Sequence, residues 1–228
     1  MLKIGDLELG TKPIIAAIID DKIPLEKIQE LKQEGVGLLE IRVDCFNRPI
    51  NEVTQYMKEV RDTLLMPTIG TIRENDSNRD SRVDLFRQIM PFVDCVDIEL
   101  GCGISDEVRR LAEGKTIMVS EHNFINTPSY TDLQMIVERA LGQGAQIVKI
   151  ATMALSLEDV RKLLRFTEDC DEPLVTIAMG AVGTVSRLIA PLFGSLFTYG
   201  YITHPVAPGQ ISVHKLLEEF RTYYPGVL

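Results

Sequence analysis

The chain has 228 residues, 45% of them hydrophobic, which is enough to form the core of one large α/β domain or two small ones. Its formal net charge of −9, without a basic stripe, argues against nucleic-acid binding. No apolar stretch reaches the length of a membrane span, and the first residues lack the long apolar region of a signal peptide. We therefore expect a single cytoplasmic domain, residues 1–228, that binds a small molecule and no membrane.

The four cysteines form neither a CxxC pair nor a repeated spacing. They are Cys45, Cys95, Cys102 and Cys170. This pattern indicates neither a zinc site nor a disulfide framework. We expect reduced thiols with structural roles.

In chain order, residues 2–9 alternate apolar and polar side chains around Gly5, which predicts a small N-terminal β-hairpin. Short apolar runs then alternate with segments whose apolar residues recur at helical spacing. The predicted strands are residues 13–19, 38–43, 67–72, 95–100, 116–119, 147–151, 174–178 and 196–198. The predicted helices are residues 24–34, 53–64, 83–90, 106–112, 130–141, 157–166, 182–192 and 213–223.

This alternation of strands and helices predicts an α/β protein with the (β/α)8 TIM barrel fold, preceded by the short hairpin. Parallel strands need helical crossovers, and eight such strands can close on themselves. An open, doubly wound sheet is the alternative. However, no GxGxxG follows the first strand and no GxxxxGK[ST] occurs, so the sequence gives no support for a nucleotide site.

The sixth predicted strand contains Lys149 within an apolar run, residues 147–151. A lysine is rarely buried without a partner, and desolvation favours its neutral amine, which is a nucleophile toward ketones. The alternative is that Lys149 extends from the strand end to solvent while its stem covers apolar surface. Taken alone, this stretch favours the alternative.

Catalytic residues of such a barrel lie at the carboxyl ends of its strands. The polar residues found in those places are Glu40, Arg42, Arg73, Asp97, Glu99, Ser120, Glu121 and His122. Arg187 follows on the seventh helix, and the Gly- and Pro-containing loop 199–212 could act as a lid. For Asp97 and Glu99 we favour an internal network of neutralising charges over a direct role.

A single histidine after a strand is often a structural residue. His122, however, lies on the strand next to that of Lys149, and histidine is the usual proton-transfer partner of an imine. His204 and His214 lack such neighbours. We expect His204 to be a loop residue and His214 a surface residue near the start of the last helix.

Seven motifs in chain order resemble those of the type I 3-dehydroquinate dehydratase family. They are EIRVD, TIR, VDIEL, SEHNF, VKIA, MGxxGxxSR and APGQI. The resemblance extends from the second predicted strand to the last helix. It implies a TIM barrel, usually a homodimer, that converts 3-dehydroquinate to 3-dehydroshikimate in the shikimate pathway of aromatic amino acid biosynthesis. It also implies that the enzyme uses no metal and no organic cofactor.

The resemblance further implies roles for individual residues. Lys149 in VKIA corresponds to the Schiff-base lysine, and His122 in SEHNF to the general acid and base. Arg187 in the SR motif corresponds to the residue that binds the substrate carboxylate. The residues implied around the substrate hydroxyls and the lid are Glu40, Arg42, Arg73 and Gln210.

Two positions depart from the family pattern. The family commonly has a glutamate and two glycines shortly after Arg73, and the glutamate helps to hold the histidine; residues 74–79 contain no glycine. Glu74 is our first candidate for a replacement and Asp76 the second. Val206 stands where many members have serine, which predicts the loss of one lid hydrogen bond.

Two other functions stay open. Another Schiff-base barrel, of the class I aldolase or transaldolase type, explains Lys149 but not APGQI. A catalytically weak barrel retained for ligand binding is suggested by the missing glutamate after Arg73. Against it, Lys149, His122 and Arg187 are all present.

Overall fold

A computed structural model describes residues 1–227; the predicted domain, residues 1–228, also includes Leu228, which lies outside the described residues. The hairpin consists of β1 (Lys3–Ile4) and β2 (Leu7–Glu8). The other strands are β3 (Ile15–Ile19), β4 (Leu38–Arg42), β5 (Thr68–Thr71), β6 (Cys95–Glu99), β7 (Thr116–Asn123), β8 (Ile147–Met153), β9 (Leu174–Met179) and β10 (Thr198–Tyr201). The α-helices are α1 (Leu25–Glu34), α2 (Ile50–Leu64), α3 (Arg82–Ile89), α4 (Ser105–Leu111), α5 (Tyr130–Gly142), α6 (Leu157–Asp169), α7 (Ser186–Ile189) and α8 (Val213–Tyr223).

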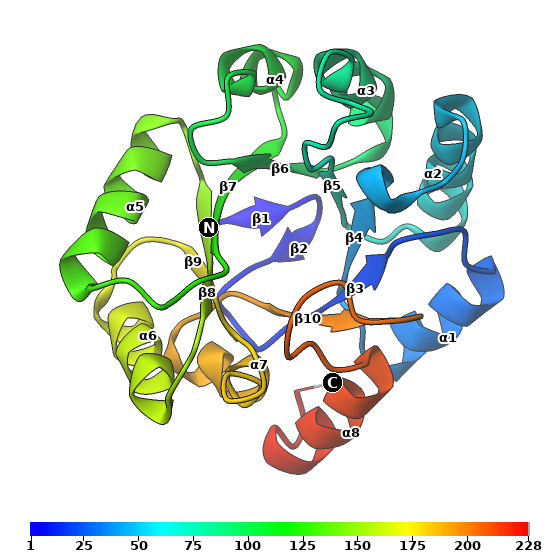
Figure 1. Cartoon of the computed structure of the whole chain (residues 1–228). Coiled ribbons are helices and arrows are strands. Elements are labelled where there is room, and N and C mark those ends of the chain that lie inside the picture. The colour runs from blue at the N-terminus through cyan, green and yellow to red at the C-terminus, as the bar shows by residue number, and fades with distance from the viewer. Residues whose placement is uncertain (228) are drawn as a thin grey trace.

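The strands β3 to β10 surround a central axis, and the helices cover them on the outside (Figure 1). The order is β10-β3-β4-β5-β6-β7-β8-β9, and every neighbouring pair is parallel. At the seam, the Leu196 N–H donates to the carbonyl of Leu174 at 2.8 Å, so the ring is nearly closed. The predicted barrel and hairpin are confirmed.

Both faces of the strands are buried, which explains their nearly continuous apolar runs. On β4, Leu39 and Ile41 pack in the layer between strands and helices, whereas Leu38 belongs to the cluster inside the barrel. Because side chains alternate along a strand, Glu40 and Arg42 share the inward face with Leu38. The alternation of side chains along β4 therefore places the charged groups of Glu40 and Arg42 inside the barrel.

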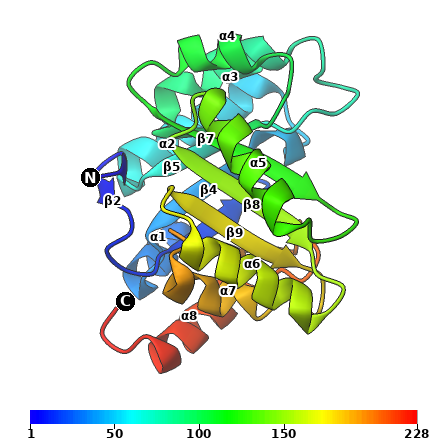
Figure 2. The same cartoon turned by 90° about the vertical axis from the view of Figure 1, so that its left-hand side faces the viewer.

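The hairpin closes the amino end of the barrel. Ile4 is completely buried in the interior cluster, and the Thr116 hydroxyl donates to the carbonyl of Lys3 at 2.6 Å. In the side view, the hairpin lies at the ends from which the strands start (Figure 2). The carboxyl ends of the strands are left for the functional site.

Two elements near the site differ from prediction. The predicted strand 116–119 is too short, because Ser120 and His122 continue the register of β7 against Lys149 and Ala151 of β8. A polar side chain that faces a cavity does not prevent its backbone from pairing with the neighbouring strand, so the strand continues through these residues. The predicted helix 182–192 is too long, since only α7 and a following 3-10 turn form there.

The last predicted strand, 196–198, is displaced. The observed strand β10 includes Tyr199, which the sequence pattern places in the loop 199–212. Glycine usually indicates a loop, but Gly200 lies in this strand because α8 packs directly onto it: an added Cβ would lie 2.9 Å from the Cα of Val213. A close approach of backbones therefore explains the missed strand.

Within residues 1–227, no helix is long and apolar enough to cross a membrane. The four cysteines are free thiols. Cys45 is exposed, Cys95 is buried, and the other two are half-buried.

Candidate active site

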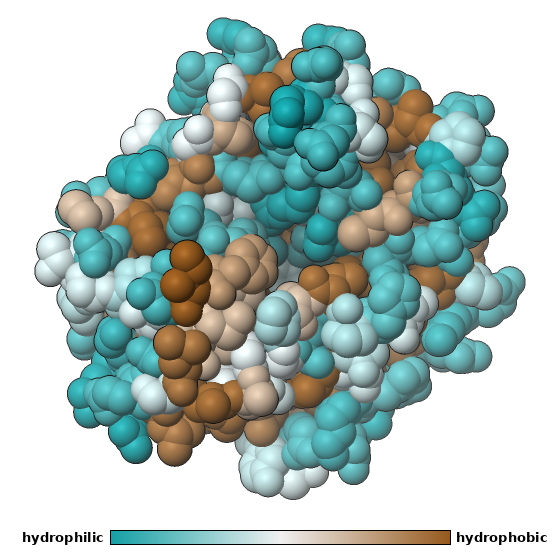
Figure 3. All heavy atoms as spheres, viewed as in Figure 1, coloured by the Kyte–Doolittle hydropathy of each residue, from teal (hydrophilic) through white to brown (hydrophobic). Residues whose placement is uncertain are grey.

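A cavity of about 400 Å³ opens at the carboxyl ends of the strands, a size suited to a small ligand. The face in Figure 3 looks onto these ends and is hollowed near its centre. All seven residues predicted for the site line this cavity: Glu40, Arg42, Arg73, His122, Lys149, Arg187 and Gln210. The fold therefore brings together residues from six different strand-and-helix units.

Lys149 lies on β8 and is only 5% exposed, so the alternative in which it extends to solvent is wrong. Its Nζ is 3.1 Å from Asp97 Oδ2 and 3.5 Å from Glu40 Oε2. The other oxygen of Glu40 accepts a hydrogen bond of 2.8 Å from the Thr71 hydroxyl. The amine is thus held inside the barrel between two oriented carboxylates.

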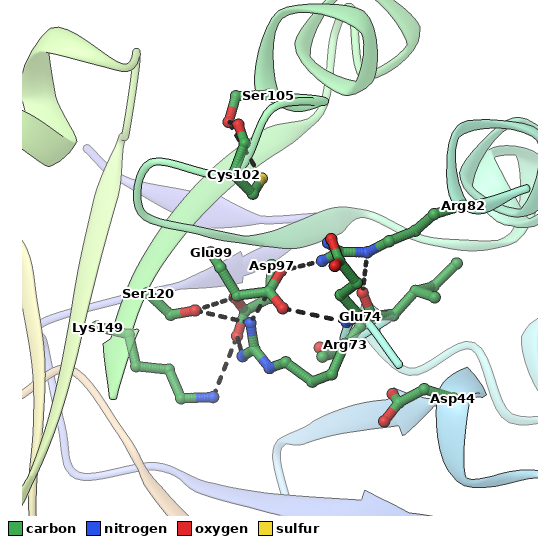
Figure 4. A network of polar contacts seen from close by, with 12 residues as sticks. Asp44, Arg73, Glu74, Arg82, Asp97, Glu99, Cys102, Ser105, Ser120 and Lys149 are labelled. Carbon is green, nitrogen blue, oxygen red and sulfur yellow. Dashed lines mark hydrogen bonds and ion pairs between the residues drawn. The ribbon is translucent and has the colours of Figure 1, made fainter. Parts of the chain in front are cut away.

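Asp97, fully buried on β6, is the centre of a polar network (Figure 4). It accepts hydrogen bonds from Arg73 Nη2 at 2.6 Å and from the Ser120 hydroxyl at 2.5 Å, besides its contact with Lys149. Burial acts to raise the pKa of Asp97, but the positive charges of Arg73 and Lys149 outweigh it and hold this pKa below its usual range. Asp97 is therefore ionised.

Arg73 is held by the same network, because its Nη1 also donates to Ser120 Oγ at 2.9 Å. Glu99 lies 3.7 Å from this nitrogen and forms a closer ion pair with Arg82. Arg82 is 1% exposed and donates through Nε to the carbonyl of Ile72 at 2.8 Å. The sequence pattern did not single out Arg82, since an arginine at a helix start is normally exposed.

His122 lies on β7 and faces the cavity, with its ring stacked against Phe124 at 6.2 Å between centroids. Burial and the positive charges of Arg73 and Lys149 lower the pKa of His122 to about 3, against a smaller opposite effect of Asp97. The imidazole is consequently neutral near pH 7. A neutral imidazole can accept a proton.

The carboxylates proposed to orient His122 are paired elsewhere. Glu74 lines the cavity, but it forms ion pairs with Arg79 at 3.0 Å and with Arg82 at 3.5 Å. Asp76 is fully exposed and lies 3.3 Å from Arg79. The interpretation that Glu74 or Asp76 replaces the missing glutamate is therefore not supported.

Arg187 is 2% exposed on α7. Its Nε donates to the carbonyl of Gly209 at 2.9 Å, and its Nη2 donates to that of Pro208 at 3.3 Å. Within the described chain no carboxylate forms an ion pair with it, and burial lowers the pKa of Arg187 to about 10. A buried guanidinium that faces a cavity without an anionic partner is suited to bind a carboxylate.

The two glycine-containing loops beneath this arginine are packed against each other. The Gly180 N–H donates to the carbonyl of Pro208 at 3.2 Å, and the Thr184 hydroxyl donates to that of Gly209 at 3.2 Å. At Gly209, φ is +69° and an added Cβ would lie 2.2 Å from the Gly180 oxygen. Glycine is therefore required at 209, and the contact fixes the carbonyls that hold Arg187.

The remaining predicted residues are partly used by the protein itself. Arg42 forms a bidentate pair with Asp44, at 3.0 and 2.7 Å. Gln210 accepts a hydrogen bond of 2.8 Å from the Val206 backbone N–H, which needs no side-chain hydroxyl at position 206. The side chain of Val206 lines the cavity and makes this part of the wall apolar.

The other two histidines lie where the sequence predicts. His204 is on the loop after β10, with Nε2 3.2 Å from Asp20 Oδ2, and His214 is exposed in the first turn of α8. Tyr199 also lines the cavity and was missed, because it was assigned to a loop. Across residues 1–227, no group of three or more His, Cys, Asp or Glu side chains is arranged to hold a metal ion.

Comparisons with known proteins agree with this geometry. The model of the Type I 3-dehydroquinase family matches residues 18–225. A 3-dehydroquinate dehydratase from Methanococcoides burtonii is 35% identical over 227 residues, covering 95% of this chain and 97% of that protein. One from Methanocella arvoryzae is 38% identical over 195 residues, covering 82% and 87%.

Solved structures show the same relationship. The type I 3-dehydroquinate dehydratase from Clostridium difficile with covalently modified comenic acid superimposes with a TM-score of 0.82 at 29% identity, covering 97% of this chain and 96% of that one. The 3-dehydroquinate dehydratase from Aquifex aeolicus gives a TM-score of 0.79 at 31% identity, covering 92% and 99%. The chain therefore belongs to the type I 3-dehydroquinase family.

Proposed function

We propose that this chain is a hydro-lyase of the shikimate pathway, which dehydrates 3-dehydroquinate to 3-dehydroshikimate through a Schiff base on Lys149. The observation that carries the proposal is the buried amine of Lys149, 3.1 Å from Asp97, in a cavity that also holds a neutral histidine and a buried arginine. The names of the relatives supply the substrate. The alternative of a class I aldolase explains only the lysine.

In the first step the Lys149 ammonium gives one proton to the ketone oxygen, its neutral amine attacks the ketone carbon, and a second proton from the nitrogen leaves with that oxygen as water. The resulting iminium keeps a positive charge on the same nitrogen, where Asp97 and Glu40 already lie within 3.5 Å. Carboxylates placed before the reaction stabilise this charge without reorganisation. The iminium also acts as an electron sink that acidifies the neighbouring C–H bond.

His122 performs the proton transfers. Its neutral ring takes the proton from the carbon next to the iminium carbon, and the electron pair forms an enamine. The enamine then expels the hydroxyl group one carbon further on, to which the imidazolium of His122 returns the proton, so that water leaves. Because Arg73 and Lys149 disfavour the imidazolium, it is a strong acid at this stage.

Hydrolysis of the conjugated iminium by one water frees the enone product and restores the ammonium of Lys149. The net change is loss of one water from the substrate, and no oxidant or reductant is needed. Because the iminium supplies the electron sink, the proposed cycle uses neither a metal ion nor an organic cofactor. Activity that stops after exhaustive chelation and returns with a divalent ion would contradict this part.

Arg187 binds the substrate carboxylate in this proposal, since its guanidinium is buried at the cavity and no carboxylate of residues 1–227 pairs with it. The hydroxyl groups of the substrate face polar side chains from the rest of the wall. Those side chains are Glu40, Arg42, Arg73 and Gln210. Only some N–H groups of Arg42 and Arg73 are available to the ligand, because the others donate to Asp44 and Asp97.

The direct test is the appearance of the conjugated enone, read by ultraviolet absorption, when the purified protein is mixed with 3-dehydroquinate. Wild-type protein should produce it, and Lys149→Met should not, although a nearly isosteric side chain keeps the interior filled. A wild-type protein without enone formation, or a Lys149→Met variant with comparable turnover, would exclude the proposed function.

We also propose that the chain is cytoplasmic and forms a homodimer. The free thiols, one of them exposed, suit a reducing compartment. Apolar surface gathers over α6 and α7 on the face in Figure 3. The exposed apolar side chains of these segments are Leu155, Leu157, Val182 and Val185. Such patches are typical of contact surfaces, and here a second copy is the proposed occupant. Light scattering should give twice 25.6 kDa; a monomer would contradict the dimer.

A further inference from the structure

Tyr199 is a buried residue of the cavity that no motif points to. It lies on β10 beside Ala16 of β3 and is 2% exposed. Its ring packs edge-on against Phe197, with 5.4 Å between the centroids. These contacts hold the ring in one place, and its inner side forms part of the cavity wall.

The face of the Tyr199 ring contacts the amine of Lys149. The Nζ atom lies 4.3 Å from the ring centroid, within the range of a cation–π interaction. Lys149 is therefore held by two carboxylates and one aromatic face. When the ammonium becomes an iminium, the positive charge stays on the same nitrogen, so the ring continues to stabilise it.

The polar group of Tyr199 is its hydroxyl. It is buried and forms no hydrogen bond of normal length among the described residues, although the Glu40 carboxylate is close enough to act on it as an acceptor. Burial, with the negative charges of Glu40 and Asp97, raises the pKa of Tyr199 well above its ordinary value, so the phenol keeps its proton. A buried donor of this kind is costly unless something else accepts its hydrogen bond.

We propose that Tyr199 is a further residue of the active site with two separable parts. Its ring positions Lys149 and stabilises the iminium, and its hydroxyl donates a hydrogen bond to an oxygen of the ligand attached to Lys149. The identity of this ligand rests on the proposed function. The ligand must be a ketone that carries hydroxyl groups. The other polar side chains of the cavity also suit such a ligand.

Two variants separate the parts. Tyr199→Phe keeps the ring and removes the hydroxyl, whereas Tyr199→Leu removes both. Tyr201→Phe is the matched control, because this tyrosine lies two residues along the same strand and does not line the cavity. The measurements are kcat and KM in the enone assay, the yield of borohydride-reduced adduct on Lys149 by peptide mass spectrometry, and the midpoint of thermal unfolding.

For Tyr199→Phe we expect a fall in kcat/KM of roughly 2- to 12-fold, the range of one neutral hydrogen bond, with the adduct yield unchanged. Its unfolding midpoint should not fall, because the variant removes a buried hydroxyl that forms no hydrogen bond of normal length. A purely structural hydroxyl would instead lower the midpoint and leave kcat/KM unchanged. For Tyr199→Leu we expect a further loss on the order of 10-fold and a lower adduct yield, because the cation–π contact is lost.

Unchanged kcat/KM in Tyr199→Phe would overturn the role of the hydroxyl. Unchanged adduct yield in Tyr199→Leu would overturn the role of the ring. Tyr201→Phe should behave as wild type, and an equal loss in this control would assign the effect to the strand rather than to the site. Wild-type turnover in the same assay separates the two proposals: without it the proposed function fails, and the ligand of the hydroxyl fails with it.

Discussion

The two walls of the cavity differ in how completely the protein pairs their polar groups. On the wall formed by β4 to β8, Arg73 and Lys149 both pair with Asp97, through contacts of 2.6 and 3.1 Å. On the wall formed by α7, β10 and the lid loop, Arg187 forms no ion pair and the Tyr199 hydroxyl no hydrogen bond of normal length within residues 1–227. The paired wall holds its charged groups in position before a ligand binds, whereas the polar groups of the unpaired wall find their partners in the ligand.

The largest expected effect concerns His122 on the paired wall. His122→Ala should lower kcat by about 10²- to 10⁴-fold, because one group serves both proton transfers. Imine formation should continue, so the borohydride adduct on Lys149 should persist. His204→Ala, at an exposed histidine of the loop after β10, is the control and should retain activity. Loss of the adduct together with turnover would show that His122 acts before the elimination.

The second effect is on stability. Asp97→Asn should lower the free energy of unfolding by about 3–5 kcal/mol, because it leaves Lys149 and Arg73 without their buried anion. Urea denaturation measures this loss, and Asp97→Asn combined with Lys149→Met should recover part of it. Asp76→Asn is the control, since that carboxylate is fully exposed and should change stability by no more than about 0.5 kcal/mol. Equal urea midpoints for Asp97→Asn and Asp76→Asn would contradict the interpretation that the paired charges of Asp97 stabilise the folded chain.

The unpaired wall should respond in the opposite way. Arg187→Met should lower kcat/KM by roughly 10- to 100-fold, mainly through KM, because one charge-assisted contact to the carboxylate is lost. The ligand-free variant should unfold at the same midpoint as wild type or higher, since a buried unpaired charge is removed. A large fall in stability with normal KM would mean that Arg187 is structural.

The smallest effect is a pH dependence of stability. The pKa of His122 is about 3 in the folded chain, below the 6.5 of an unperturbed histidine. Between these values the unfolded state binds a proton that the folded state does not, so stability falls as the pH falls below about 6.5. Above that pH the group contributes no slope. His122→Ala should flatten the decrease between pH 7 and pH 5; parallel curves would show that His122 titrates normally.

The sequence allowed the barrel and several residues that line its cavity to be predicted for clear physical reasons. Apolar runs alternating with helical patterns define the order of the elements, whereas the run around Lys149, taken alone, favours a lysine that extends to solvent. The inward parity of Glu40 and Arg42 followed from the alternation of side chains along β4. The family resemblance added the roles, which spacing alone does not supply.

Other features depend on contacts between distant segments. Tyr199 was missed because Gly200, required for the packing of α8, resembles a loop residue in the sequence. Glu74 was assigned to His122, but neither its pairing with Arg82 nor the burial of Arg82 is visible before the chain folds. In the same way, the lack of an ion pair at Arg187 is a property of three-dimensional arrangement, and no local pattern encodes it.

The central claim is that the buried amine of Lys149 forms the imine, and reductive trapping tests it most directly. Borohydride added to wild-type protein together with 3-dehydroquinate should leave a covalent adduct, and peptide mapping by mass spectrometry should place it on Lys149. Lys149→Met should give no adduct under the same conditions. An adduct on a different lysine, or full turnover without any adduct, would contradict the account.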